Sequence, residues 1–298
     1  MARSQLLYKA SADTGFHGDA EFRAFESEEI LEKFPEILGR MKPALEIMVR
    51  GTGIREMPSS IIQHQTHLTF LELSSMSNLV ALPSRICMLK GLVKLNVSHC
   101  SKLVALPSSI GMLKGLVKLN VSHCSKLVAL PSSIGMLKGL VNLNVSFCSK
   151  LETLPGEIGN LGNLVKLDVS WCSKLESLPE EIGDLDNLVK LKASYTQISQ
   201  PPYSIVQLNK LIFLSFERQC LEDGVYFVFP QVDGGLRSLQ ILDLSFCNLI
   251  DEGLPEDVGC LSSLKELHLS GNNFEHFPGS IAQLVALKTL YLHSCQNF

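Results

Sequence analysis

The chain contains 298 residues, of which 46% are hydrophobic and 7% aromatic, and its formal net charge is −4. A weakly acidic chain gives no electrostatic reason to expect nucleic acid or an anionic membrane surface as its partner. No stretch approaches 18 consecutive apolar residues, and the first residues lack the apolar core of a secretory signal. We therefore expect a cytoplasmic protein without a membrane span, with the nucleus as an additional location.

The first part of the chain carries little pattern. Residues 1–29 contain no usable repeat and are expected to form an irregular, poorly ordered segment. Residues 31–37 resemble half of the unit that dominates the rest of the chain, and a loose copy of that unit begins at Ala44. We therefore expect a single repeat domain over residues 30–298.

A 24-residue repeat governs the middle of the chain. Residues 92–115 and 116–139 are identical, and the first block of the unit starts at Leu68, Leu92, Leu116, Leu140, Leu164 and Leu188. A unit of this length holds too few apolar side chains to close a core alone, so it becomes stable only by stacking on its neighbours. The sequence therefore predicts a solenoid.

Each unit has two halves. In residues 95–98, Leu-Asn-Val-Ser, apolar and polar residues alternate, which predicts a short strand with one buried face. Eight residues or so later comes Leu-Pro, as in residues 106–107, and proline cannot donate to a sheet ladder, so the return half leaves the sheet. In residues 110–113 apolar side chains lie three apart, which predicts a short helical or 3-10 turn.

Stacking equivalent strands about 4.8 Å apart completes the fold prediction. We expect an α/β solenoid, a leucine-rich-repeat horseshoe with a concave parallel β-sheet of about 11 short strands. Loops and short helical turns should form its convex side.

The unit at residues 211–238 breaks the rhythm, because it is longer and lacks Leu-Pro. Insertions in solenoids emerge as loops on one face, often the binding face. Here Tyr226, Phe227 and Phe229 either fold back over the core or offer their rings to a partner; we favour folding back, because exposed aromatic clusters are rare. Looser units begin at Leu239, Leu264 and Leu287, and the chain stops within a unit, as expected for an array cut at its ends.

Six of the nine cysteines share one position of the unit, just after the strand: Cys100, Cys124, Cys148, Cys172, Cys247 and Cys295. We expect a column of buried, reduced thiols that act as small apolar residues. Stacked parallel Cβ vectors are poor disulfide geometry, and zinc sites use closer cysteine pairs.

No pattern of catalytic chemistry is found in the sequence. There is no phosphate-binding loop, kinase loop, H-E-x-x-H or G-x-S-x-G motif. The Asn-Val-Ser triplets at residues 96, 120 and 144 match the glycosylation pattern, but they are by-products of the repeat. We therefore predict no enzyme activity and no catalytic, cofactor or metal site.

Outward strand positions form four columns across the sheet. The first holds Lys94, Lys118, Asn142, Lys166 and Lys190; the second Asn96, Asn120, Asn144, Asp168 and Lys192; the third is almost all serine, including Ser74, Ser98, Ser122, Ser146, Ser170, Ser194, Ser245 and Ser270; the fourth holds His99, His123, Phe147, Trp171, Tyr195, Arg218 and Phe246.

Exposed aromatic rings flanked by lysine and serine are typical of a protein-binding surface. The alternative is that the rings pack sideways on one another and only cover the rim of the core. We predict that the partner is a protein, with no nucleic acid and no small-molecule substrate, and that its contacts on the concave face are Lys94, Asn96, His99, Lys118, Asn120, His123, Asn144, Phe147, Lys166, Asp168, Trp171, Lys190, Lys192 and Tyr195.

Three parts of the chain carry a family resemblance: residues 51–61 (Gly-Thr-Gly-Ile-Arg-Glu-Met-Pro-Ser-Ser-Ile), the 24-residue units with cysteine after the strand, and residues 247–257. Together they resemble the repeat domain of plant intracellular immune receptors of the Toll-domain, nucleotide-binding class. The resemblance implies a module that senses a pathogen effector or restrains a neighbouring nucleotide-binding switch.

Two other functions are compatible with the repeat. One is a cytosolic signalling scaffold of the Ras-group leucine-rich type, whose units usually have about 23 residues with asparagine in place of cysteine. The other is the substrate arm of an enzyme such as a ubiquitin ligase or a kinase. The cysteine column and residues 51–54 argue against the scaffold.

Overall fold

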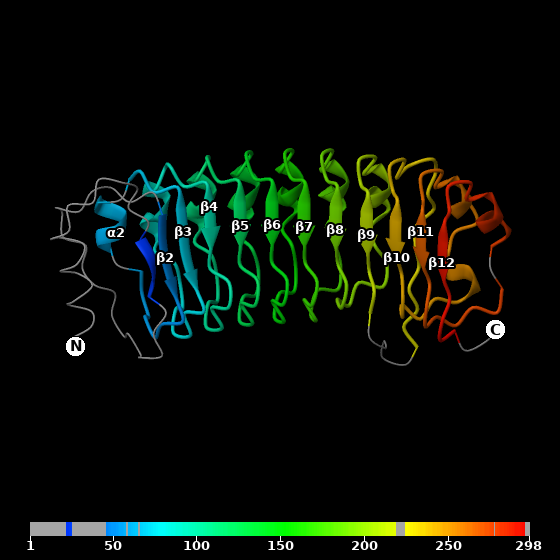
Figure 1. Ribbon diagram of the computed structural model, residues 1–298, viewed down its shortest axis with the longest axis horizontal. Helices are drawn as coiled ribbons and strands as arrows, with labels where there is room; N and C mark the ends of the chain where they lie inside the picture. Colours follow the sequence, from blue (N-terminus) through cyan, green and yellow to red (C-terminus); the bar gives the residue numbers. More distant parts are fainter. Residues whose placement is uncertain are drawn as a thin grey trace.

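The computed structural model describes residues 22–25, 46–57, 59–64, 66–218, 224–276 and 278–295, which build one elongated solenoid (Figure 1). A single parallel sheet runs along it, with the strands paired in chain order. In the described residues the strands are β1 (Phe22–Phe25), β2 (Glu46–Arg50), β3 (Phe70–Ser74), β4 (Lys94–Asn96), β5 (Lys118–Asn120), β6 (Asn142–Asn144), β7 (Lys166–Asp168), β8 (Lys190–Lys192), β9 (Phe213–Ser215), β10 (Ile241–Asp243), β11 (Glu266–His268) and β12 (Thr289–Tyr291).

The predicted fold class is confirmed. The sheet has twelve strands over the described ranges, one more than the approximate number expected. The additional strand is β1, whose sequence Phe-Arg-Ala-Phe lacks the leucine pattern of the other units. The remainder of the segment 1–29 lies outside the described residues, so its expected irregularity stays a prediction.

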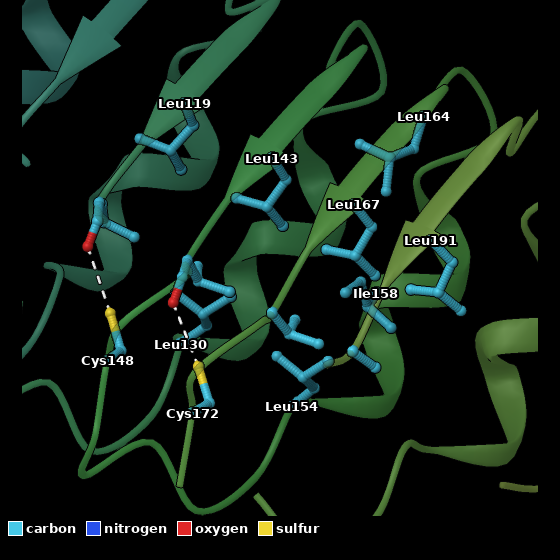
Figure 2. Close-up of a cluster of buried hydrophobic side chains, with 14 of the residues drawn as sticks. Leu119, Leu130, Leu143, Cys148, Leu154, Ile158, Leu164, Leu167, Cys172 and Leu191 are labelled. Atoms are coloured by element: carbon cyan, nitrogen blue, oxygen red, sulfur yellow. Dashed lines mark hydrogen bonds between the residues drawn. The ribbon is translucent and has the colours of Figure 1, made fainter. Parts of the chain in front are cut away.

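Strand register follows the repeat, because identical positions pair across neighbouring strands. Leu119 pairs with Leu143, Leu143 with Leu167, and Leu167 with Leu191. These side chains form a row beneath the sheet and are at most 1% exposed (Figure 2). Burying one such side chain contributes about 1.5–3 kcal/mol, so each unit is held mainly by its neighbours.

The return halves run away from the sheet as predicted. A short α-helix, α2 (Ser59–His64), precedes a series of 3-10 turns: η1 (Ser84–Met88), η2 (Ser108–Met112), η3 (Ser132–Met136), η4 (Gly156–Asn160), η5 (Glu180–Asp184), η6 (Tyr203–Gln207), η7 (Asp251–Gly253), η8 (Val258–Cys260) and η9 (Gly279–Gln283). Most follow a proline in an extended conformation, such as Pro107 with φ −67° and ψ 144° before η2.

Neighbouring turns pack closely because the unit has glycine at their centre. A Cβ built on Gly135 would overlap the backbone carbonyl oxygen of Glu157 in the next turn. A second, minor ladder joins the segments between strand and turn, in which Ala81, Ala105, Ala129 and Thr153 form successive parallel bridges. The isoleucine-glycine pair of the repeat therefore sets how tightly the units stack.

The irregular unit folds back over the core at two of the three aromatic residues of its insertion. Phe227 and Phe229 are buried, and the Phe227 ring lies 5.3 Å from that of Phe216. The backbone N–H of Phe229 donates a hydrogen bond to the carbonyl of Gly253. The prediction is confirmed for these two rings and wrong for Tyr226, which is 48% exposed. Residues 219–223 of this unit lie outside the described residues.

Candidate recognition surface

The first outward column is basic, and its members stand in register on β4–β8. The ammonium group of Lys190 lies 4.4 Å from the centre of the Phe213 ring. Burial, followed by the positive charges of Lys192 and Lys166, lowers the pKa of Lys190. In the described part of the chain, no carboxylate lies within ion-pair distance of these lysines. The column therefore forms a stripe of positive charge without an ion-pair partner in the described residues, interrupted once by asparagine; its members are Lys94, Lys118, Asn142, Lys166 and Lys190.

The residues of the second column occupy the last position of strands β4–β8. In Asn96, Asn120, Asn144 and Asp168, Oδ1 accepts a hydrogen bond of 2.9–3.1 Å from the backbone N–H two residues later. This side-chain hydrogen bond takes the place of a backbone hydrogen bond to a neighbouring strand, which explains why these strands are only three residues long. All four side chains are half-buried. A partner can reach the atoms that remain, such as the amide nitrogen of Asn120 and the second carboxylate oxygen of Asp168.

The serine column does not form part of the exposed surface, and this expectation was wrong. Its members are buried, with Ser98 and Ser122 each 6% exposed and Ser170 8% exposed. A side chain this short does not extend past the larger residues on either side of it. Ser194 and Ser215 bond to each other, with 2.6 Å between their Oγ atoms. The third column is therefore a polar floor between the lysine column and the rings.

The fourth column has an unusual backbone. His99, His123, Phe147, Trp171 and Tyr195 all have φ between 58° and 62°. This left-handed conformation is uncommon for residues other than glycine and costs roughly 1–2 kcal/mol per residue. Five bulky side chains in it require a compensating interaction, and ring stacking provides one.

The five rings form a continuous stack, which we call the ring ladder (His99, His123, Phe147, Trp171 and Tyr195). Successive ring centres lie 4.0, 4.2, 5.2 and 3.9 Å apart, with planes within 13° of parallel. Such pairs contribute about 0.5–1.5 kcal/mol each beyond the area they bury. Sideways packing therefore does occur, yet Phe147 and Trp171 remain 38% and 39% exposed.

Burial and neighbouring groups shift the pKa of one residue near each end of the ring ladder. The hydroxyl of Tyr195 donates to Oε1 of Glu217 at 3.0 Å, and burial together with this bond raises the pKa of the tyrosine. At the other end, burial and the neighbouring charge of His99 lower the pKa of His123. The second cause follows from the geometry, because the His99 ring lies 4.0 Å from the His123 ring and a like charge at that distance opposes protonation of His123.

Arg218 departs from the column in which it was expected. It is 2% exposed, lacks the positive φ of its neighbours, and none of its three guanidinium nitrogens has a hydrogen-bond partner. Burial lowers its pKa. The irregular unit changes the backbone here, so the side chain does not continue the stack. Phe246, with φ 57° and 37% exposure, resumes the column in the next unit.

One polar network was not predicted from the sequence. Glu72 on β3 is 4% exposed and accepts hydrogen bonds from Arg50 Nη2 at 2.8 Å, Ser74 Oγ at 2.9 Å and Asn96 Nδ2 at 2.9 Å. Glu72 occupies the position of the asparagines, and only its place beside an arginine on β2 could have signalled the network. These contacts occupy the carboxylate of Glu72 and the amide nitrogen of Asn96, so neither group is free on this face.

The cysteine column lies on the inner side, and its predicted burial is confirmed for the five members from Cys100 to Cys247; Cys295 is half-buried. Each thiol donates to a backbone carbonyl of the preceding strand segment, with Sγ–O distances of 3.3 Å from Cys148 to Val121 and 3.2 Å from Cys172 to Val145 (Figure 2). Burial raises the pKa of both thiols to about 12. These groups are held protonated and tie neighbouring units together.

The described residues contain no group of three or more histidine, cysteine, aspartate or glutamate side chains placed to hold a metal ion. Among the same residues, no helix is long and apolar enough to cross a membrane. The predicted contact residues lie on the sheet face over β4–β8, between the lysine column and the ring ladder.

Comparison with known families agrees with this architecture. A family model described as "Leucine-rich repeat region" matches residues 55–177, and one described as "Leucine Rich Repeat" matches residues 238–261 and 263–284. A solved leucine-rich-repeat protein of Leptospira interrogans superposes with a TM-score of 0.57 at 33% sequence identity, covering 84% of this chain and 66% of that one.

Two curated plant proteins are similar in sequence. TMV resistance protein N of Nicotiana glutinosa is 46% identical over 277 residues, which make up 93% of this chain and 18% of that protein. Disease resistance-like protein DSC1 of Arabidopsis thaliana is 42% identical over 73 residues, 24% of this chain and 6% of that protein. This chain spans less than a fifth of the first relative. It belongs to the leucine-rich-repeat family, as a repeat region of the kind found in plant disease-resistance proteins.

Proposed function

We propose that the chain is the recognition region of a plant intracellular immune receptor of the Toll-domain, nucleotide-binding class. It acts in the cytoplasm, and also in the nucleus, by binding a protein: a pathogen effector, a host protein that the receptor monitors, or the receptor's own signalling domains. It recognises and does not catalyse. The similarity to TMV resistance protein N over 93% of the chain supports the receptor class.

The observation that carries the proposal is the exposed stripe of rings and lysines across five successive units. Aromatic residues at the centre of an interface are the commonest sites of high binding energy. Phe147 and Trp171 present more than a third of their surface to solvent at the middle of the ring ladder. Standard interfaces need about 20–30 residues a side, and the outward positions of this face together with its rims are numerous enough.

The test is capture of a partner by the full 298-residue chain from infected leaf tissue, followed by titration of the captured protein. Trp171→Ala is expected to weaken binding by 2 kcal/mol or more, the usual threshold for a dominant contact. Lys138→Ala, in the loop between η3 and β6 where Nζ bonds to the carbonyl of Asn160, is the control outside the predicted contact residues and should leave binding unchanged. Equal binding by the wild type and Trp171→Ala would contradict the proposed site.

A further inference from the structure

The ring ladder differs from an ordinary aromatic patch because its ring faces are already occupied. His123, Phe147 and Trp171 each have a neighbouring ring on both faces, at centre-to-centre distances of 3.9–5.2 Å. Only the outer faces of His99 and Tyr195, at the two ends, are not covered by another ring of the stack. The exposed surface of Phe147 and Trp171 therefore consists mainly of ring edges, although the 5.2 Å between their centres also leaves part of each face uncovered by the other ring.

Ring edges and ring faces attract opposite charges. The face of an aromatic ring is negative and attracts cations, whereas its edge is positive. The histidine and tryptophan edges also carry N–H groups, which are hydrogen-bond donors. A stack that presents mainly edges consequently favours acceptor groups, such as carboxylates and backbone carbonyls, over a lysine or arginine.

The lysines on the same face have the same preference. Five lysines, at residues 94, 118, 166, 190 and 192, stand on β4–β8 with a single carboxylate among them, that of Asp168. Because no carboxylate in the described residues is in ion-pair range of these ammonium groups, their charge is available to a partner. Positive ring edges and positive side chains thus line both sides of the buried serine floor.

We infer that this face binds an extended acidic segment of the partner protein, with carboxylates on the lysine column and carbonyl or carboxylate oxygens on the edges of the ring ladder. This rests on the proposed function and specifies the chemistry of its partner. The span from β4 to β8 is about 19 Å, which an extended segment of about six residues covers. Single-stranded nucleic acid is disfavoured, because bases bind such surfaces by stacking on free ring faces.

The chain carries its own reporter for this site. Trp171 is its only tryptophan, so the intrinsic fluorescence of the full chain reports from the middle of the ring ladder. Three ligands are titrated separately into the full chain, up to about 1 mM, the weak end of specific binding. They are octaglutamate, octalysine and an eight-nucleotide single strand of deoxythymidylate. We expect a saturable change with octaglutamate that weakens as salt is added, and none with octalysine.

Charge variants separate the site from net charge. The triple variant Lys118→Gln, Lys166→Gln and Lys190→Gln is expected to weaken octaglutamate binding by about tenfold or more. The control removes the same charge from the loops between a 3-10 turn and the next strand, with Lys114→Gln, Lys138→Gln and Lys210→Gln, whose ammonium groups bond to acceptors there. Its affinity should stay within about twofold of wild type. Thermal melting of both variants establishes that they are folded.

Three results would each overturn the inference: no octaglutamate binding, octalysine or the oligonucleotide binding as tightly as octaglutamate, or equal losses in the two triple variants. If one of these results is obtained while protein capture still depends on Trp171, the inference of an acidic segment is wrong and the proposed function is unaffected. Octaglutamate binding without capture of any protein would instead count against the proposed function alone.

Discussion

The ring of Phe246 occupies the space that a side chain at Gly271 would fill. A Cβ built on Gly271 would overlap Cδ1 and Cε1 of that ring. Gly271 has a φ of +67° and stands at the ladder position of the following unit, so glycine there serves both the backbone and the ring. The fourth column thus contains five rings that stack on one another and, further along, a glycine that leaves room for the ring of the preceding unit.

Gly271→Ala is expected to destabilise the chain by about 2–4 kcal/mol, from the left-handed backbone and the overlap with Phe246 together. The matched control is Gly51→Ala, which stands at the same repeat position with φ +63° and no atom within 4 Å of its added Cβ. It should cost only the backbone part, about 1–2 kcal/mol. Urea unfolding of both variants measures the difference, and equal losses would show that the Phe246 contact is not limiting.

Trp171→Ala and Leu167→Ala separate the ring ladder from the core. The tryptophan variant loses two stacking contacts and opens no internal cavity, so we expect a loss of about 1–2 kcal/mol. Leu167→Ala should lose about 2–5 kcal/mol, because Leu167 is 1% exposed and its removal leaves a cavity. Thermal and urea unfolding decide the comparison. If Trp171→Ala unfolds as easily as Leu167→Ala, the ring belongs to the core and not to a recognition surface.

The cysteine column should make stability fall at alkaline pH. Burial raises the pKa of Cys148 to about 12 from the ordinary value of 9.0. Below pH 9 the thiol is protonated in both folded and unfolded chains; above it the unfolded chain loses the proton first, so stability declines as the pH rises from 9 towards 12. Cys148→Ala should therefore show a shallower decline in urea midpoint than wild type. Cys260→Ala, which removes an exposed thiol, is the control and should follow the wild type.

Asn272 takes the cysteine position in a later unit and should be harder to replace. Its Oδ1 accepts from the Leu249 N–H at 3.0 Å, and its Nδ2 donates to the carbonyls of Leu244 at 2.9 Å and Leu269 at 2.8 Å. Asn272→Ala leaves these buried groups without partners and is expected to cost about 3 kcal/mol or more. Cys172→Ala, which loses one weak thiol bond, should cost about 1 kcal/mol. Hydrogen exchange of the neighbouring amides locates the effect, and a smaller loss for Asn272→Ala would contradict it.

The sequence predicted those features that depend on the 24-residue period. Alternation within residues 95–98 places Leu95 and Val97 inside, and the same rule holds wherever the unit recurs. It also placed the cysteine column correctly. Periodicity does not determine backbone conformation at the strand end, so the positive φ of Trp171 and the stacking that accompanies it could not be predicted. The length of a serine side chain, and not its position, explains why Ser98 is buried.

The remaining differences come from contacts between units that are not identical. Arg218 is buried because the unit that contains β9 departs from the repeat, whereas the prediction from columns assumes that every unit follows it. The hydrogen bonds of Glu72 depend on Arg50 in the preceding unit, a neighbour that only the strand register identifies. The strand β1 has no leucine at the usual positions, so its pairing with β2 had no sequence signal.

The duplication of residues 92–115 has a consequence for how this surface can change over generations. Removing one copy joins the unit before it to a sequence identical to the one it already contacts, so the new junction reproduces an existing one. Gain or loss of a unit therefore lengthens or shortens the sheet by about 4.8 Å and the ring ladder by one imidazole, without creating a contact that has never been selected. The number of units can therefore change from one generation to the next and alter the length of the surface, while the contacts between neighbouring units remain the same.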